Sequence, residues 1–277
     1  MTLPTEIGLF EACESVTATK PLVNAVTNAV TMNDVANLTL HWGGLPVMSD
    51  DRREVGEMVS TADACLLNMG DVSEEGERTM LAAGRAATEA GIPLVLDPVG
   101  VGATEIRTSV GARLRAELDV TIVNGNYAEI SALAGERANV RGVEAVGEYD
   151  GIATAARTLA RETESVVVAS GETDVIADEA GAVEVSVGHP MLGRVVGTGC
   201  MLGATLATFA AGGGDAFSAA LSGTLAFGLA AERAAAGEYG EFHGPASYKT
   251  AFLDSVADFD GSSTPDIEAR LASETDG

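Results

Sequence analysis

Short, unbroken apolar runs alternate along the chain with longer stretches of helical pattern. The apolar runs are rich in valine, leucine and isoleucine, and they cover residues 21–26, 64–69, 93–99, 119–124 and 165–170. Runs of this length without polar alternation are typical of strands that a parallel sheet buries on both faces. The pattern therefore predicts the strands of a mainly parallel sheet.

The stretches between these runs predict helices. In SEEGERTMLAAGRAATEAG, Ser73 has the character of an N-cap and Gly91 that of a helix terminator. Residues 151–163 and the run that begins near Cys200 have a similar pattern, whereas residues 173–188 predict a hairpin that turns near 179–181. Because strand and helix alternate, we expect right-handed βαβ units and a three-layer αβα sandwich.

Length and cysteine content limit the class of protein. The 277 residues suit one α/β domain, 1–277, whose last ~10 residues we expect to be loosely held. Cys13, Cys65 and Cys200 are too few and too scattered for a disulfide framework, and their spacing matches no zinc pattern. No apolar run has the length of a membrane span, and the N-terminus lacks the basic region of a secretory signal. We expect a cytoplasmic protein.

The charge of the chain indicates which partners it avoids and in what salt concentration it works. A formal net charge of −25 and a pI of about 4.2 argue against nucleic acid or an anionic membrane as a partner. Lysine occurs only at Lys20 and Lys249. Such a composition predicts a halophilic protein, because concentrated salt screens the repulsion between its acidic groups.

Polar residues follow most of the predicted strands at their carboxyl ends. In open α/β sheets ligands bind beyond these ends. Taken singly, each of these residues fits a turn or a helix cap, but their placement on one rim predicts a site. The rim residues are Asn24, Asn28, Asn68, Asp97, Asn124, Asn126, Ser170 and Glu129, the last on the first helical turn after Asn126.

The sequence GRVVGTGCML, residues 193–202, predicts an anion hole formed by Gly197, Thr198 and Gly199. A helix that begins at about Cys200 directs its unpaired N–H groups and the positive end of its dipole toward this loop. In that position the helix dipole lowers the pKa of a thiol. We therefore expect Cys200 to be catalytic and to face the substrate; the alternative is a small buried apolar residue.

Asp97 and Glu129 are the predicted metal-supporting residues. Two carboxylates beside an anion hole suit Mg²⁺, held directly or through water next to a phosphate. GTGC is neither the P-loop GxxxxGK[ST] nor the Rossmann GxGxxG, so the residues indicate phosphoryl transfer on another architecture.

From about residue 21 to residue 211 the chain resembles the hydroxyethylthiazole kinases of thiamine salvage, within the ribokinase-like superfamily. The matching stretches are PLVNAVTNAVTMNDVANLTLHWGGLPVMSD, LLNMGD, LVLDPVGVGAT, NGNYAEISALAGE, VVASGETDVI and GTGCMLGATLATFAA. The resemblance implies transfer of the γ-phosphate of ATP, with Mg²⁺, to the primary alcohol of 4-methyl-5-(2-hydroxyethyl)thiazole. The product is the thiazole phosphate from which thiamine phosphate is built.

The resemblance also implies roles for individual residues. Met48 is similar to the family's thiazole contact, Asn28 to a partner of the substrate hydroxyl, and Gly197 to the substrate-binding glycine. The nucleotide contacts fall on Asn124, where the family usually has arginine, and on Ser170, where it usually has threonine.

The family further implies a homotrimer with active sites shared between subunits. Two other functions stay open on the residues: a ribokinase-like kinase of another small alcohol, and a nucleotide-driven nicotinamide-hydrate dehydratase. The dehydratase predicts aspartate at the position of Cys200, so this cysteine and the residues around Met48 count against it.

Salt should stabilise the protein. Because repulsion among the acidic groups weakens as the Debye length falls to a few ångströms, we expect the Tm to rise steeply with KCl. Thermal unfolding from low to molar KCl measures this, with an uncharged osmolyte at matched osmolality as the control. A flat Tm across the KCl series would contradict the halophilic interpretation.

Overall fold

The computed structural model describes residues 8–135, 140–141, 144–145, 151–262 and 266–274. The α-helices are α1 Leu9–Thr19, α2 Met32–His41, α3 Val55–Val59, α4 Glu74–Ala90, α5 Glu105–Glu117, α6 Tyr127–Leu133, α7 Ile152–Thr163, α8 Thr198–Ala211, α9 Ala216–Ala235 and α10 Pro245–Ala257. Two 3₁₀ turns, η1 Leu192–Arg194 and η2 Glu268–Arg270, accompany them. No helix in these ranges is both long and apolar enough to cross a membrane.

The centre of the fold is a nine-stranded sheet in the order β11-β10-β9-β8-β5-β4-β3-β1-β2. Its strands are β1 Leu22–Val26, β2 Leu45–Val47, β3 Ala64–Asn68, β4 Leu94–Asp97, β5 Ile122–Asn126, β8 Val166–Ser170, β9 Asp174–Ala177, β10 Ala182–Val185 and β11 Leu271–Glu274. Neighbours from β2 through β8 pair parallel, and β8 through β11 pair antiparallel. A separate hairpin joins β6 Val140–Arg141 to β7 Glu144–Ala145.

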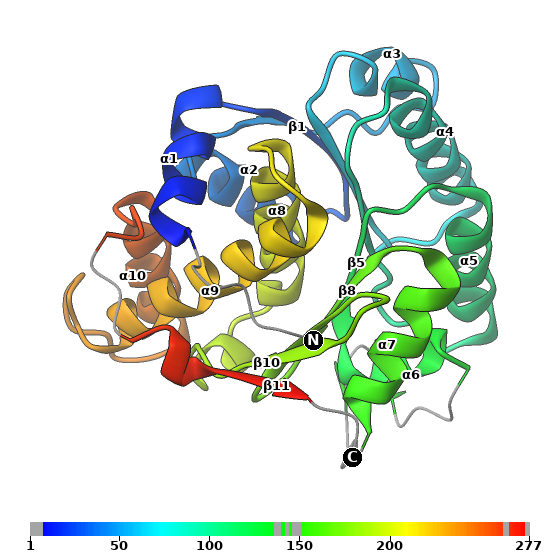
Figure 1. The fold of residues 1–277 in the computed structure, drawn as a ribbon. Helices are drawn as coiled ribbons and strands as arrows, with labels where there is room; N and C mark the ends of the chain where they lie inside the picture. The colour runs from blue at the N-terminus through cyan, green and yellow to red at the C-terminus, as the bar shows by residue number, and fades with distance from the viewer. Residues whose placement is uncertain (1–7, 136–139, 142–143, 146–150, 263–265, 275–277) are drawn as a thin grey trace.

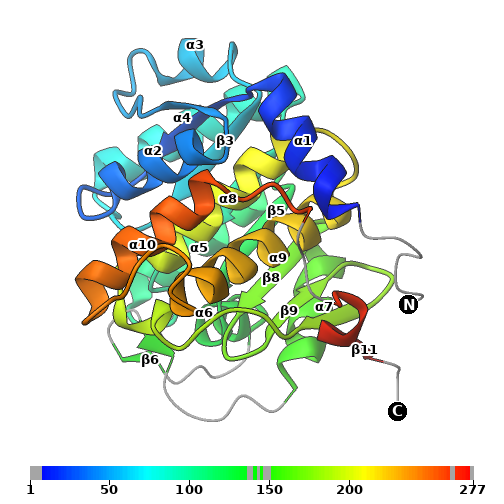
Figure 2. The ribbon, with the colours of Figure 1, turned by 90° about the vertical axis from the view of Figure 1, so that its left-hand side faces the viewer.

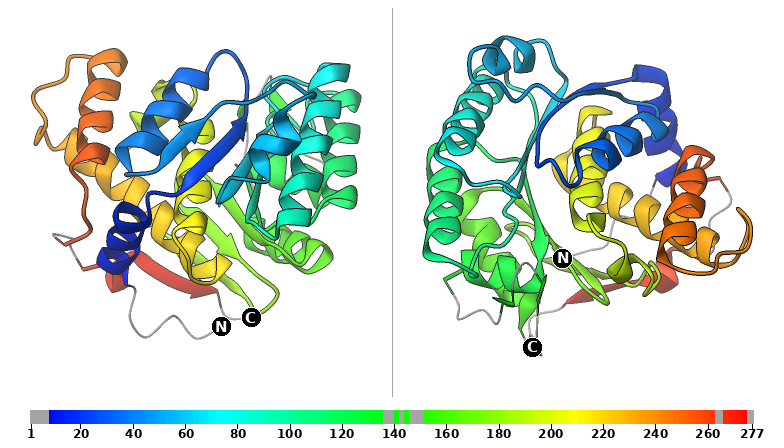
Figure 3. Two further views of the ribbon diagram at one scale, coloured as in Figure 1. Left: turned by 90° about the horizontal axis from the view of Figure 1, so that it is seen from above. Right: turned by 180° about the vertical axis from the view of Figure 1, so that it is seen from behind.

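Helices cover both faces of the sheet. Helices α1, α2, α8, α9 and α10 lie on one face and α3 to α7 on the other, as Figure 1 shows. The same three layers are visible from above and from behind (Figure 3). The predicted αβα sandwich is therefore confirmed.

Most of the predicted elements are present within a few residues. Ser73 caps α4 by accepting a hydrogen bond from the Gly76 N–H, and Gly91 ends the helix in the left-handed conformation, with φ of +66°. The predicted hairpin is β9–β10. Helix α8 begins at Thr198, two positions before the expected Cys200.

The structure corrects the expectation for the C-terminal residues. Leu271–Glu274 forms β11, which pairs antiparallel with β10 at the edge of the sheet. The short strand β2, which pairs parallel with β1 at the opposite edge, was also not predicted. A segment of three or four residues is too short for its hydrophobic periodicity to predict a strand. These two segments become strands because they pair with a neighbouring strand.

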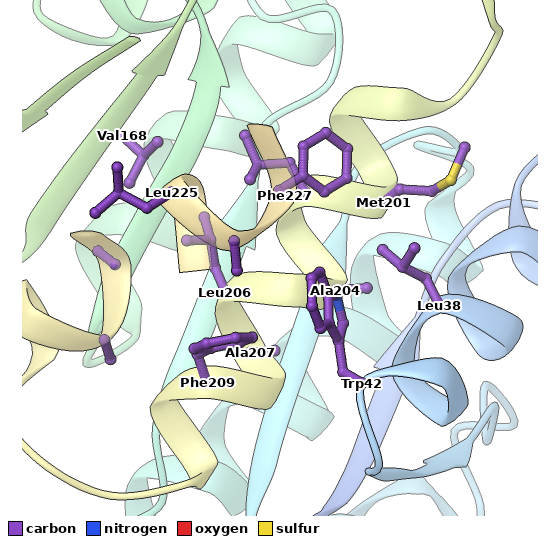
Figure 4. Packing of buried hydrophobic residues seen from close by; sticks show 14 of the residues in the cluster. Leu38, Trp42, Val168, Met201, Ala204, Leu206, Ala207, Phe209, Leu225 and Phe227 are labelled. Atoms are coloured by element: carbon purple, nitrogen blue, oxygen red, sulfur yellow. The ribbon is translucent and has the colours of Figure 1, made fainter. Parts of the chain in front are cut away.

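Helix α8 is the buried centre of its layer. Every residue from Cys200 to Ala210 is buried. Figure 4 shows Met201, Ala204, Leu206, Ala207 and Phe209 of this helix among side chains from α2, α9 and β8. In Figure 2 helix α9 is seen alongside α8, and α10 packs against α9. The other side of α8 meets the sheet, since a Cβ at Gly203 would lie 3.3 Å from Leu66 of β3 and 3.5 Å from Asp97 of β4.

Candidate active site

The N-terminus of α8 forms an open cradle, defined here as Gly197, Thr198 and Gly199. Gly197 is the N-cap, with φ of +92°, and a Cβ there would lie 2.6 Å from Thr31 Cγ2. No side chain of the described residues caps this helix end. The Thr198 hydroxyl donates to Leu192 O at 3.1 Å, so the donor that this residue offers an anion is its backbone N–H. Unpaired N–H groups and the helix dipole make such an end suited to anions.

Cys200 is 8% exposed and lies behind the cradle. The Asn28 Nδ2 atom is 4.0 Å from its Sγ. Burial, and second the charge of Asp97, raise the pKa of the Cys200 thiol to about 12, although hydrogen bonds from Thr31, Asn68 and Asn28 lower it in part. The expected lowering of this pKa is therefore wrong, because burial and the carboxylate outweigh the helix dipole. At neutral pH the group is a thiol.

Asn28 is held in place by its own turn. Its Oδ1 accepts hydrogen bonds from the N–H groups of Val30 (3.0 Å) and Thr31 (3.2 Å). Its Nδ2 donates to Thr31 Oγ1 and to Asn68 Oδ1, both at 2.9 Å. Gly70 packs against this amide so closely that a Cβ there would lie 2.3 Å from Nδ2. The side chain that the resemblance assigns to the substrate hydroxyl therefore lies beside Cys200.

Two buried carboxylates follow β4 and β5. Asp97 is 3% exposed, and its Oδ2 accepts a hydrogen bond from Asn68 Nδ2 at 2.5 Å. Glu129 is 4% exposed and accepts from the Gly100 N–H at 2.6 Å and from the Asn126 N–H at 2.8 Å. Burial, and then the charge of Glu129, raise the pKa of Asp97 well above its usual range. Burial beside a second acidic group therefore favours the uncharged form of Asp97.

The residues assigned to the nucleotide lie at different depths. Asn124 is 1% exposed and donates from Nδ2 to Gly199 O at 3.3 Å, so it holds the first turn of α8. Its buried Oδ1 has no hydrogen-bond partner among the described residues. Ser170 lies half-buried at the end of β8, where its hydroxyl is 3.4 Å from Gly125 O. Of these two residues, Ser170 lies at the rim of the sheet and Asn124 lies deeper, beneath the first turn of α8.

Met48 directly follows the edge strand β2. It is half-buried and packs against the apolar core on the face that α8 covers. The next residue, Ser49, is fixed by the buried amide of Asn24, which accepts from the Ser49 N–H at 3.3 Å and donates to Ser49 O at 3.4 Å. Asn24 thus ties the Met48 segment to β1.

Arg107 was not among the residues predicted for the site, whereas Asn68 was predicted at the rim without a role of its own. The Arg107 guanidinium donates to Met69 O and Val99 O, each at 2.6 Å, and to Gly70 O at 3.1 Å. It thereby joins the segments that follow β3 and β4. The sequence did contain an indication that Arg107 has another partner. No acidic residue lies three or four positions from it, so it cannot form the ion pair that is common along a helix.

The fold is shared with a solved structure of distant sequence. A ribokinase-like superfamily protein from Enterococcus faecalis V583 has the same fold at 11% identity, with a TM-score of 0.61 over 93% of this chain and 91% of that one.

Sequence comparison narrows the class to one family. Residues 13–261 match the Hydroxyethylthiazole kinase family. Hydroxyethylthiazole kinases of Natronomonas pharaonis and Haloquadratum walsbyi are 62% and 58% identical, over 91% and 90% of this chain and 90% and 86% of theirs. The structure of a hydroxyethylthiazole kinase protein from Pyrococcus horikoshii OT3 is similar, with a TM-score of 0.83 at 33% identity, over 96% of this chain and 99% of that one. The chain belongs to the hydroxyethylthiazole kinase family. The first two relatives come from halophiles, in agreement with the expectation from charge.

Replacing Glu129 with glutamine should destabilise the fold. Glutamine retains one oxygen, so its amide N–H groups face the N–H of Gly100 or of Asn126. Loss of a hydrogen bond to a charged group costs about 1.5–3 kcal/mol. We expect Glu129→Gln to lower the free energy of unfolding by this amount in urea titrations at high salt.

The matched control is Glu77→Gln, because Glu77 pairs with Arg113 at the surface. A surface ion pair contributes about 0–1 kcal/mol. Equal losses in the two variants would contradict the assigned role of the Glu129 carboxylate.

Proposed function

We propose that this chain transfers the γ-phosphoryl group of ATP to the primary alcohol of 4-methyl-5-(2-hydroxyethyl)thiazole, in the thiamine pathway. Family membership supports the reaction. The observation that carries the proposal is the uncapped N-terminus of α8, directly beside Cys200 and Asn28. N–H groups placed in this way stabilise negative charge that develops on a transferred phosphoryl group.

On the substrate side, Met48 contacts the thiazole, Asn28 binds the hydroxyl and Gly197 lines the site. The support is positional: Asn28 is fixed by its turn next to the cradle, and Asn24 holds the segment that carries Met48. Ordered groups of this kind bring the alcohol close to the phosphate at little entropic cost.

On the nucleotide side, Ser170 contacts ATP from the rim, and Asn124 acts from beneath the cradle. Because Asn124 is neutral and buried, the backbone N–H groups of Thr198 and Gly199, and not a guanidinium, bind the phosphates. Backbone N–H groups add no side-chain charge to this acidic chain.

Mg²⁺ fits the residues below the cradle. Asp97 offers a carboxylate and Asn124 an unpaired amide oxygen, and hard oxygen donors are what this ion prefers. We assign Asp97 as a ligand, directly or through water, and Glu129 as a second negative charge whose oxygens also hold residues 100 and 126. Bound Mg²⁺ neutralises charge on the phosphates. The Glu129→Gln variant should then also need more Mg²⁺, with thiazole affinity nearly unchanged.

Cys200 acts as a thiol. Burial, and second the charge of Asp97, raise the pKa of Cys200 to about 12, which favours the thiol over the thiolate. A loose phosphoryl-transfer transition state does not require early removal of the proton. We propose that the thiol orients the alcohol. As the new P–O bond forms and the bond between the γ-phosphorus and the leaving ADP oxygen breaks, the alcohol proton passes to an oxygen of the transferred phosphoryl group.

We also propose a cytoplasmic homotrimer, in which each 1–277 domain shares its active sites with neighbouring subunits. The exposed apolar residues Val30 and Val196, each 75% exposed, lie close to the site and suit contact with a second copy.

One assay tests the reaction. Purified protein is incubated with ATP, Mg²⁺ and the thiazole alcohol in high salt, and the phosphate ester is detected by mass spectrometry. We expect one ester per ADP formed. Phosphorylation of a different small alcohol only, or ATP hydrolysis coupled to dehydration of nicotinamide hydrate, would refute the proposal.

Substitution of Cys200 separates its roles. We expect Cys200→Ala to lose much of kcat, on the order of 100-fold, with a modest change in KM, because the alcohol loses the group that orients it. Cys200→Asp should remain active, because a carboxylate at this position can orient the alcohol and accept its proton. Steady-state kinetics of both variants measure this.

Cys13→Ala is the control, since Cys13 is also buried and its pKa is also raised to about 12, but it lies in α1. An alanine variant at position 200 that is as fast as wild type, together with an inactive aspartate variant, would show that Cys200 only packs.

A further inference from the structure

Asn68, at the end of β3, connects the two sides of the site. It is 2% exposed. Its Oδ1 accepts hydrogen bonds from Asn28 Nδ2 and from the Gly70 N–H, both at 2.9 Å, and its Nδ2 donates to Asp97 Oδ2 at 2.5 Å. Every heteroatom of the amide is therefore used.

The orientation of this amide is determined by its neighbours. The Gly70 N–H can only donate, so the oxygen of Asn68 must face it, and Nδ2 must then face the carboxylate of Asp97. A flipped amide would set two donors together and leave the carboxylate facing an oxygen. The donor end and the acceptor end of Asn68 thus have separate partners.

Those partners belong to different substrates. Asn28 lies on the alcohol side, next to Cys200, and Asp97 lies on the phosphate side. Strand β3 runs between β1 and β4, and Asn68 is directly opposite Asp97 in the β3–β4 register. One amide therefore connects Asn28 to Asp97 through hydrogen bonds.

The surrounding backbone is arranged to keep this amide still. Arg107 binds the carbonyl groups of Met69 and Gly70, the two residues after Asn68, and that of Val99 after Asp97. Residue 70 has to be glycine for Asn28 to keep this position, because a Cβ at Gly70 would lie 2.3 Å from its Nδ2.

We infer that Asn68 is a positioning residue that sets the separation between the alcohol held by Asn28 and the phosphoryl group supported by Asp97. The inference rests on the proposed function. In-line transfer through a loose transition state depends largely on placement of the two reactants, and a displacement of about 1 Å can cost about 100-fold in rate.

Two substitutions test the two ends of the amide separately. Asn68→Asp keeps an oxygen for Asn28 and Gly70 but replaces the donor to Asp97 with a repelling carboxylate. Asn68→Ala removes both ends. We expect kcat to fall about 10- to 100-fold in both variants, the range for loss of one hydrogen bond to a charged group.

Binding of the thiazole alcohol, measured by calorimetry in Mg²⁺-free buffer without ATP, separates the variants. We expect the Kd of Asn68→Asp to stay near the wild-type value, and that of Asn68→Ala to rise several-fold because Asn28 loses a partner. Asn37→Asp is the control: it adds the same charge at the surface of α2, where Asn37 donates only to Asn33. Its kinetics and binding should match wild type.

The outcomes are distinguishable. A wild-type protein that forms no thiazole phosphate refutes the proposed function. An active wild type with an Asn68→Asp variant of unchanged kcat overturns the positioning role alone, as does equal loss of thiazole binding in both variants. Failure of both variants to fold in thermal unfolding would also overturn it, because Asn68 would then be needed for the fold.

Discussion

The packing of α8 against the middle of the sheet is the constraint on which the site depends. Gly203 lets this helix approach β3, β4 and β5 so closely that a Cβ would lie 3.3–3.5 Å from Leu66, Asn124 and Asp97. On its other side Trp42 donates to Thr205 Oγ1 at 2.9 Å and stacks edge-on against Phe209, with ring centroids 5.4 Å apart. The helix is therefore fixed on both sides, and its N-terminus meets the carboxyl ends of the strands. A shift of α8 would move the cradle away from Asn28 and the carboxylates together.

This arrangement also places a local positive potential on a chain with a net charge of −25. Surface arginines are used in ion pairs, such as Arg113 with Glu77 and Glu117, and Arg85 with Glu117. Arg107, at the site, binds backbone carbonyl groups. The positive potential at the cradle comes instead from the oriented peptide groups of α8, whose helix dipole carries about half an elementary charge at this end.

The same burial that orders the site changes the chemistry of its groups. Cys200 and Asp97 both have raised pKa values, because each is removed from water and faces negative charge. A raised pKa favours the protonated, uncharged form of each group. In that form the thiol and the carboxyl group act through hydrogen bonds and not as charges. Asn28 and Asn68 supply these hydrogen bonds as neutral amides, which cost less to bury than ions do.

Periodicity, cap residues and glycine positions in the sequence determined the features that depend only on neighbouring residues, namely single strands, helix caps and the cradle. The strands near 21–26, 64–69 and 165–170, the caps of α4 and the cradle at Gly197 follow from neighbouring residues and were predicted within a few positions. The tertiary structure alone decided the edge strands β2 and β11, which need a partner strand to form. It also decided the raised pKa of Cys200 and the hydrogen bond from Asn68 to Asp97. Both arise from groups far apart in the sequence, whose burial and separation exist only once the sheet has brought them together.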